Sequence, residues 1–396
     1  MRKLILVTFA VIGSSTGPAR LPAQTVGAQA SLKPTLTGYY THVPWDGGTH
    51  TDAAFQALSG TTIPMSTYSF VATKDNRTYT GTLVGTSPFA SPKTGTTINA
   101  VIVPLKISIG ASIFDPSAAN SCDGNVSPLL RFQQSPIMAP VTNLGINGVN
   151  VGTAQFINGF RRAEFWSTIG GSASYQNPIS YTTASPYVIS SATVGTHGIT
   201  YSSGCSLLGV VSNSWLDSYL KTTVMPALKA SGVISPTSFV VFLFKNVVQS
   251  GSNPPTMSNC CILGYHGATG NPVQTYSPMT WETTGLFGAG TADGSVASHE
   301  IGEWMDDPLG TNATPPWGGI GQVSGCQGNW ENGDPLSGTL MPPITLSGKA
   351  YHMQELGFFS WYYNKLGTAS VGTGGKFSSN GKFAGPSKAC PPGGTN

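Results

Sequence analysis

Residues 238–244 read SFVVFLF, and this stretch decides the fold class. A continuous apolar run of this length is typical of a strand that is buried on both faces of a sheet. Two later runs, at residues 262–266 and 273–280, are predicted to be strands that pair with each other. Strand-like patterns also occur earlier in the chain, at residues 69–72, 78–84 and 98–103. The chain is therefore predicted to be rich in β-structure.

Three segments have helical periodicity instead: residues 154–166, 214–230 and 293–307. Asn213 or Ser214 can cap the second helix, and Pro226 is expected to kink it or end it early. The predicted fold is α+β, with a β-rich N-terminal part and a mixed C-terminal part. Residues 31–365 form either one domain or two subdomains split near residue 205. Residues 366–396, rich in Gly, Ser and Pro, are expected to be a flexible tail.

The N-terminus has the order of a secretory signal peptide. A short basic region, Met1-Arg2-Lys3, precedes an apolar run at residues 4–12 that is too short to cross a bilayer. Cleavage is expected after Ala30 or, as a second candidate, after Ala23, so residues 1–30 are assigned to the signal peptide. No later stretch reaches the about 18 apolar residues of a membrane span. The mature protein is expected to be secreted or periplasmic, with no membrane association.

The composition excludes some classes of function. The net charge is only +3, which is too weak to predict binding to nucleic acid. Six cysteines in an exported chain predict up to three disulfides: Cys122, Cys205, Cys260, Cys261, Cys326 and Cys390. Because sequence neighbours rarely bond to each other, Cys260 and Cys261 are expected to have separate partners.

The candidate chemistry lies in residues 298–308, which read SHEIGEWMDDP. A helix is predicted from about Asp293 to the residue before Pro308, because proline disfavours helical backbone at the preceding residue. On this helix His299 and Glu303 are four residues apart, so their side chains lie one turn apart on one face. This spacing allows two side chains to bind one metal ion.

Nearby carboxylates strengthen the case for a cation. Glu300 lies where a carboxylate can accept a proton from water at a metal, and Asp306 is within reach of the same ion. Between Lys245 and Lys349 there is no Lys or Arg, while half of the sixteen acids of the chain lie there. Carboxylates at a helix C-terminus repel one another and the helix dipole, and a divalent cation reverses this penalty. The alternative is a solvated acidic surface.

The motif resembles the HExxH helix of zincin metallopeptidases, with Glu303 where the second histidine belongs. More narrowly, residues 298–364 resemble a group of bacterial exported proteins with a zincin-like motif. In that group an E-x-x-D segment and a Y-x-x-Q segment follow, which are residues 331–334 and 351–354 here. The resemblance implies, in gluzincin fashion, the following roles: metal binding by His299, Glu303 and Glu331, general base catalysis by Glu300, and support of His299 by Asp334.

The resemblance implies an exported metal-dependent hydrolase, a zincin-like peptidase that uses Zn²⁺ to cleave a peptide or protein substrate. One departure matters, because the carboxylate of Glu303 adds negative charge to the ion and makes water at the metal less acidic. It also favours a hard ion such as Ca²⁺. The alternative is a non-catalytic exported β-rich protein with a structural or Ca²⁺ site at the acidic segment. A carbohydrate-acting protein ranks lower, since Glu300 and Glu303 on one helix face do not flank a glycosidic bond.

Other residues carry weaker signals. His266, on the predicted strand before the motif helix, can line a cleft, but a structural histidine is the better interpretation. His42 stands alone in the sequence and predicts nothing. Arg161 and Arg162 share a helix with Glu164 and are predicted to form a solvated ion-pair face.

Overall fold

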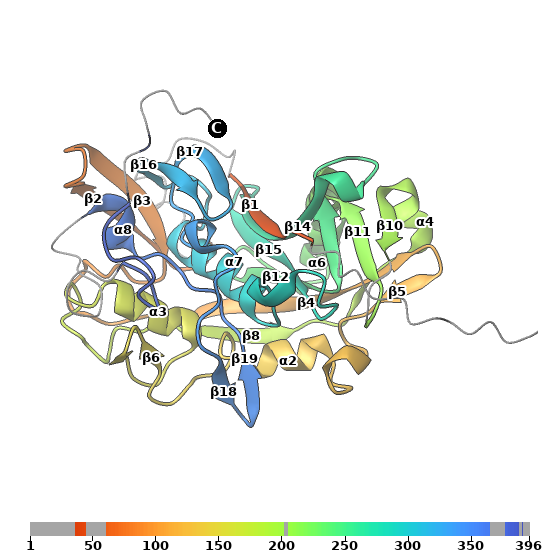
Figure 1. Cartoon of the computed structure of the whole chain (residues 1–396), viewed down its shortest axis with the longest axis horizontal. Helices are drawn as coiled ribbons and strands as arrows, with labels where there is room; N and C mark the ends of the chain where they lie inside the picture. Colours follow the sequence, from red (N-terminus) through yellow and green to blue (C-terminus); the bar gives the residue numbers. More distant parts are fainter. Residues whose placement is uncertain (1–35, 45–60, 202–204, 365–376, 388–389, 391–396) are drawn as a thin grey trace, which may run out of the picture. The chain divides into compact units, whose positions relative to one another are not determined.

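The apolar run at residues 238–244 forms β12 (Phe239–Lys245), an interior strand of a mixed sheet (Figure 1). The computed structural model describes residues 36–44, 61–201, 205–364, 377–387 and 390. β12 runs parallel to both of its neighbours, β15 (Gln274–Trp281) and β4 (Ile98–Ile109). Six of its seven residues are buried, as predicted for a strand covered on both faces.

The sheet has eleven strands within the described residues. The predicted runs at 262–266 and 273–280 belong to β14 and β15, which pair antiparallel as expected. The main path of the sheet, in spatial order, is β10 (Gly198–Tyr201), β11 (Leu208–Ser212), β13 (Val247–Ser250), β14 (Cys260–Thr269), β15, β12, β4 and β5 (Ser112–Phe114). Three more strands pair with members of this path: β1 (Tyr39–Val43) with β14, and β8 (Ile179–Thr183) and β9 (Tyr187–Ile189) with β4. Strands from both sides of residue 205 thus belong to one sheet.

Side chains of β12 alternate between two apolar cores, one on each face of the sheet. Phe239 and Leu243 belong to one core, and Val240 and Phe244 belong to the other. The first core includes α7 (Ser295–Asp306), whose Trp304 ring stacks on Phe239 at 3.7 Å. The second core includes α5 (Asn213–Tyr219), the π-helical turn η3 (Leu220–Val224) and α6 (Met225–Ala230). The fold is α+β and β-rich, as predicted.

The remaining elements are short. The other α-helices are α2 (Pro128–Gln134), α3 (Phe156–Glu164), α4 (Ser191–Val194) and α8 (Phe359–Tyr363). Separate two-stranded sheets are formed by β2 (Met65–Val71) with β3 (Thr78–Val84), β6 (Gly145–Ile146) with β7 (Val149–Asn150), β16 (Ala313–Ile320) with β17 (Val323–Asn329), and β18 (Ile344–Leu346) with β19 (Lys349–Tyr351). The 3₁₀ turns are η1 (Ser121–Asp123), η2 (Gly195–His197), η4 (Met257–Asn259), η5 (Gly288–Gly290) and η6 (Asp334–Leu336). The loop between β17 and η6 passes beside α7.

Two predicted helices differ in detail from the structure. The segment 214–230 is helical, but a π turn separates α5 from α6, and Pro226 is the second residue of α6. Proline has no N–H to donate to the preceding turn, so regular α-helical bonding is interrupted there. The Ser212 side chain caps α5, one residue before the predicted cap. α7 ends at Asp306, as Pro308 predicted, and begins after Gly294 without a side-chain cap.

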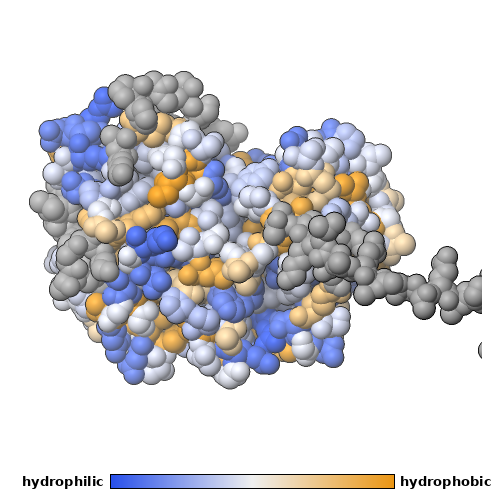
Figure 2. Space-filling view, viewed as in Figure 1, coloured by the Kyte–Doolittle hydropathy of each residue, from blue (hydrophilic) through white to orange (hydrophobic). Residues whose placement is uncertain are grey.

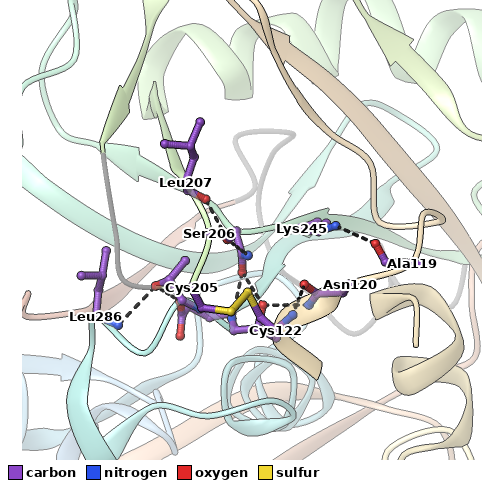
Figure 3. Close-up of a disulfide and its surroundings, with 12 residues drawn as sticks. Ala119, Asn120, Cys122, Cys205, Ser206, Leu207, Lys245 and Leu286 are labelled. Atoms are coloured by element: carbon purple, nitrogen blue, oxygen red, sulfur yellow. Dashed lines mark hydrogen bonds between the residues drawn. A yellow bond between two sulfur atoms is a disulfide. The ribbon is translucent and has the colours of Figure 1, made fainter. Parts of the chain in front are cut away.

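All six cysteines are disulfide-bonded, as Cys122–Cys205, Cys260–Cys261 and Cys326–Cys390. The prediction that Cys260 and Cys261 have separate partners is wrong, because the other four cysteines pair among themselves. Figure 3 shows the first bond, which joins η1 to the start of the segment that leads into β11. Beside it Lys245 Nζ donates a hydrogen bond to the Ala119 carbonyl, at 3.3 Å.

The two terminal segments were predicted to be a signal peptide and a flexible tail. The predicted signal peptide lies outside the described residues. Residues 377–387 of the expected tail are packed rather than loose, because Ser378 and Ser379 are buried and Ser378 Oγ donates to Glu355 Oε1 at 2.6 Å. The Cys326–Cys390 disulfide joins the end of this segment to β17.

The surface offers no single apolar face in the view of Figure 2, where hydrophilic and hydrophobic residues are interspersed. Of the large hydrophobic side chains that are exposed, Phe89 lies in a turn, Ile113 in β5 and Val188 in β9. Among the described residues, none of the helices has the length and apolar character of a membrane span.

Candidate metal centre

The helix α7 directs three of the predicted site residues toward β14. His299 and Glu303 are one turn apart, as predicted, and His299 Nε2 lies 2.9 Å from Glu303 Oε1. Glu300 faces the same strand. All three side chains are at most 1% exposed, because the apolar side chains of α7 pack the helix against the sheet.

The strand β14 contributes a histidine, His266, and a glycine, Gly264, to the site. His266 and Gly264 alternate with Tyr265, whose side chain enters the core on the opposite face of the sheet. His266 Nδ1 lies 3.6 Å from Glu300 Oε2 and 3.6 Å from Glu303 Oε2. Gly264 has no side chain, and a Cβ there would come within 2.9 Å of Glu300 Cγ. The absence of a side chain at 264 therefore lets Glu300 lie against the strand.

The loop after β17 closes the cluster from the other side. Gly333 N–H donates to Glu303 Oε1 at 3.1 Å, and Asp334 Oδ1 lies 3.5 Å from His299 Nε2. Gly333 also packs against the His299 imidazole so closely that a Cβ would overlap the ring. Glu331 lies in the same loop, with Oε2 4.0 Å from His266 Nε2.

The strand β1 covers the cluster. The Tyr40 ring stacks on the His299 imidazole, with ring centroids 3.6 Å apart and an interplanar angle of 15°. His42 Nδ1 lies 3.0 Å from Glu331 Oε1. The side-chain amide of Gln322 pairs with the backbone of Tyr40, accepting from its N–H at 2.9 Å and donating to its carbonyl at 3.0 Å. In Figure 1 this red strand lies beside β14.

Two groups of potential ligand atoms form within this cluster. In each group the atoms lie within 4.8 Å of one another: His299, Glu303 and Asp334 form one, and His266, Glu300 and Glu303 form the other. Two atoms bound to one zinc ion at about 2.1 Å are at most about 4.2 Å apart, so small adjustments bring either group into a ligand geometry. Of the predicted ligands, His299 and Glu303 are together. Glu331 lies at the edge of the cluster, where its nearest histidines are His42 and His266.

Many polar atoms of the cluster have no hydrogen bond of normal geometry. These are both ring nitrogens of His266 and His299, both carboxyl oxygens of Glu300, and Oε2 of Glu331. Most buried polar atoms in proteins have a partner, so this concentration needs an explanation. Neutral imidazoles and carboxylates are also the donor set that zinc uses. The residues therefore fit a divalent metal ion.

Burial and mutual repulsion shape the protonation of the cluster. Burial raises the pKa of Glu300 and of Glu303 well above the ordinary value, and the charge of Glu331 raises both further. Burial lowers the pKa of His266 to about 4, so its imidazole is neutral at pH 7, which is the form that binds metals. The charge of Glu331 raises the pKa of His42 to about 9. These two residues therefore form an ion pair.

Two expectations about charges near the motif are wrong. Asp306 does not face the cluster: its Oδ1 lies 3.3 Å from Arg161 Nε, and its Oδ2 accepts from Asn332 Nδ2 at 2.7 Å. Arg161 and Arg162 are buried rather than solvated. Arg161 Nη1 donates to the carbonyl of Met305, at 2.8 Å, near the C-terminus of α7. A basic side chain distant in sequence thus neutralises part of the helix end.

His42 and His266 were not predicted as site residues. Both lie on strands far from the motif in sequence, and only the pairing of β1 with β14 brings His42 opposite His266. The weak signal for His266 was its place on the strand before the motif helix. His42 carried no signal at all.

A separate cavity of about 530 Å³ lies near the N-terminus of α7. Charged side chains that line it include Asp123, Arg131, Asp293 and Lys349, and none of its lining residues belongs to the cluster.

Comparison with protein-family models, with curated proteins and with solved structures finds no match to this chain.

Proposed function

We propose that this protein is an exported metal-dependent hydrolase with an HExxE variant of the zincin motif, acting on a peptide or protein substrate. His299 and Glu303 hold the ion, with a third carboxylate from the loop that carries Glu331 and Asp334. Asp334 is the closer of these two to His299. The observation that carries the proposal is the convergence of buried histidine and carboxylate atoms that lack hydrogen-bond partners.

The ion supplies positive charge that polarises a carbonyl group and makes water more acidic. Glu300 accepts the proton, because both of its carboxyl oxygens are free of other hydrogen bonds. His266 Nδ1 lies 3.6 Å from Glu300 Oε2. A buried, apolar surrounding strengthens each of these electrostatic interactions.

Access to the site requires that β1 moves. With β1 in place, Tyr40 is 4% exposed and covers His299, while the His42 side chain, at 26% exposed, is the cluster residue nearest to solvent. An extended peptide that replaced β1 could form the same backbone bonds to β14 and to Gln322. This is the mode in which an extended chain adds a strand to a sheet edge.

The experiment combines metal analysis with a hydrolysis assay. Purified protein loaded with Zn²⁺ is expected to retain zinc through gel filtration and to cleave labelled casein or a mixture of fluorogenic peptides. A Glu300→Gln variant should retain an ion at His299 and Glu303 but lose turnover, and a His299→Ala variant should lose both. His197→Ala, outside the cluster, is the matched control. Hydrolysis that Glu300→Gln leaves unchanged would remove this residue from the mechanism.

The alternative is a non-catalytic exported protein in which the ion is structural or is Ca²⁺. Complete burial of the ligand atoms supports a structural role. The imidazoles in both groups argue against Ca²⁺, which prefers oxygen ligands. Under this alternative a chelator lowers the melting temperature, and no variant or condition yields hydrolysis.

A further inference from the structure

We infer that the cluster holds two divalent ions, bridged by the carboxylate of Glu303, rather than one. The first ion is the one in the proposed function, on which this inference rests. The second position is formed by His266, Glu300 and the other oxygen of Glu303.

The two ligand groups share a single residue. His299, Asp334 and Glu303 form the first group, and His266, Glu300 and Glu303 form the second. The shared carboxylate turns a different oxygen to each: Oε1 lies 2.9 Å from His299 Nε2, and Oε2 lies 3.6 Å from His266 Nδ1. A carboxylate with one oxygen toward each ion is a bridging ligand. Two-metal hydrolytic sites have ions about 3.5–4 Å apart, which one bridging carboxylate can span.

His266 is the observation that a single ion leaves unexplained. The side chain is completely buried, and neither ring nitrogen makes a hydrogen bond of normal geometry, although the imidazole interacts with the Asp307 backbone. Its Nδ1 points between Glu300 and Glu303 at equal distances of 3.6 Å. A buried imidazole with no role as ligand would be expected to bond a neighbour that fixes its tautomer. An ion at this position satisfies the imidazole and both carboxylates together.

The charge of the cluster points the same way. Glu331 is paired with the protonated imidazole of His42, whereas Glu300, Glu303 and Asp334 form no ion pair with Lys or Arg among the described residues. Burying uncompensated charge is costly, so the cluster has to approach neutrality. One divalent ion leaves one of these three negative charges without compensation, and a second ion offsets it.

The two-ion arrangement changes the role of Glu300. With one ion, Glu300 is free to act as a base. With two ions, Glu300 would be a ligand of the second ion. Part of its role as general base would then be supplied by the charge of the ions, which makes bound water more acidic. The metal content of a Glu300→Gln variant therefore separates the two arrangements.

The test is the zinc content of purified, Zn²⁺-loaded protein after gel filtration. Wild-type protein is expected to hold about two zinc ions per chain. His266→Ala, Glu300→Gln and Asp334→Asn are each expected to hold about one, and Glu303→Gln less than one, while the control His197→Ala retains the wild-type amount. Circular dichroism checks that each variant is folded. If one variant does not fold, the remaining ones still decide the outcome.

A second readout reports the distance between the ions directly. In protein loaded with Mn²⁺, two ions that share a carboxylate should show an exchange-coupled electron paramagnetic resonance spectrum, and His266→Ala should convert it to that of an isolated ion. One zinc per wild-type chain, together with unchanged content in His266→Ala, overturns the second site. Two ions without hydrolysis overturn only the proposed function, and one ion with hydrolysis overturns only this inference.

Discussion

The helix α7 carries two buried clusters of carboxylates, and their negative charge is compensated in different ways. At its C-terminal end Asp306 and Glu164 lie with the guanidinium of Arg161. Each of these three side chains makes at least one hydrogen bond, although some of their other polar atoms make none. About two turns earlier, His299 and Glu300 lie with His266, and none of these makes a hydrogen bond of normal geometry. The first cluster is compensated by the protein itself. The second is complete only with a ligand from outside.

This difference teaches how to separate a structural carboxylate from a ligand carboxylate. Asp306 and Glu303 are three residues apart on one helix and both are buried. Burial alone therefore does not mark a metal ligand. A structural carboxylate lies beside an arginine of the protein, whose charge a chelator cannot remove. A ligand carboxylate lies beside a metal ion, which a chelator can remove.

The largest expected effect comes from removing the fixed charge. Arg161→Met leaves Asp306 and Glu164 buried without compensation, and loss of one partner of a buried ion pair costs about 3–5 kcal/mol in unfolding free energy. Urea denaturation of metal-free protein measures the loss. Arg161→Lys should recover part of it, and the exposed Arg77→Met should change stability by less than about 0.5 kcal/mol. His299→Ala should lower the zinc content with a smaller effect on metal-free stability. If Arg161→Met is as stable as wild type, the first cluster is not held by its ion pair.

The pH dependence of stability provides the next effect. Burial raises the pKa of Asp306 to about 6 and also raises the pKa of Glu164, although the charge of Arg161 opposes both rises. Because one arginine compensates only one carboxylate, the two carboxyl groups share a proton. Because the folded pKa lies above the unfolded value of 3.8, the unfolded state releases its proton first as the pH rises. The stabilising contribution is complete below about pH 4 and is lost by about pH 6, with a slope of at most about 1.4 kcal/mol per pH unit.

Asp306→Asn tests this assignment, because asparagine mimics the protonated carboxyl group at every pH. The difference in unfolding free energy between Asp306→Asn and wild type, measured in chelator, should shift in favour of the variant between pH 4 and pH 6. Carboxyl groups of the metal cluster titrate in both proteins and cancel in the difference. Parallel stability curves would show that Asp306 does not hold the proton.

The sequence predicted the parts of this comparison that depend on local spacing. The apolar run at 238–244 identified the interior strand, and the spacing of His299 and Glu303 placed them on one face of a helix. Both results follow from backbone periodicity, which a short segment reports by itself. The fold class was predicted for the same reason.

The parts that the sequence did not predict depend on contacts between distant segments. Arg161 lies 144 residues before the Met305 carbonyl that it bonds, so the lack of basic residues near the motif in sequence did not reflect its surroundings in space. His42 reaches the cluster only because β1 pairs with β14 in a particular register. A helix that includes Arg161 and Arg162 has the composition of an exposed face, and only tertiary packing reveals that it is buried.

A smaller effect is expected from the glycine that borders His299. The imidazole lies between the Tyr40 ring and Gly333, so Gly333→Ala forces the ring to move. Displacing a ligand of this kind typically costs about 10–100-fold in metal affinity, which competition with a chromophoric chelator measures. Gly264→Ala meets the more flexible Glu300 side chain and should cost less. Gly145→Ala, where a Cβ meets nothing within 4 Å, is the control. Equal affinities in all three variants would show that neither glycine shapes the site.

The smallest effect concerns the strand that covers the second cluster. Gln322→Ala removes both hydrogen bonds to the Tyr40 backbone, each of which contributes about 0.5–1.5 kcal/mol, and also the hydrogen bond that Gln322 Nε2 donates to Asp334 Oδ1. Weakening the closed state by about 1 kcal/mol raises the open fraction roughly five-fold. Release of zinc to a chelator should therefore accelerate by about that factor, and hydrolysis with it if opening limits turnover.

Gln133→Ala is the matched control for this last change. Gln133 also donates one hydrogen bond, to Thr183, but lies outside the cluster and away from β1. The first cluster, compensated by Arg161, should keep its stability in both variants because neither touches it. Zinc release that is unchanged in Gln322→Ala would mean that β1 is a permanent part of the fold. The contrast on α7 would then be between two structural clusters, one neutralised by an arginine and one by ions that never leave.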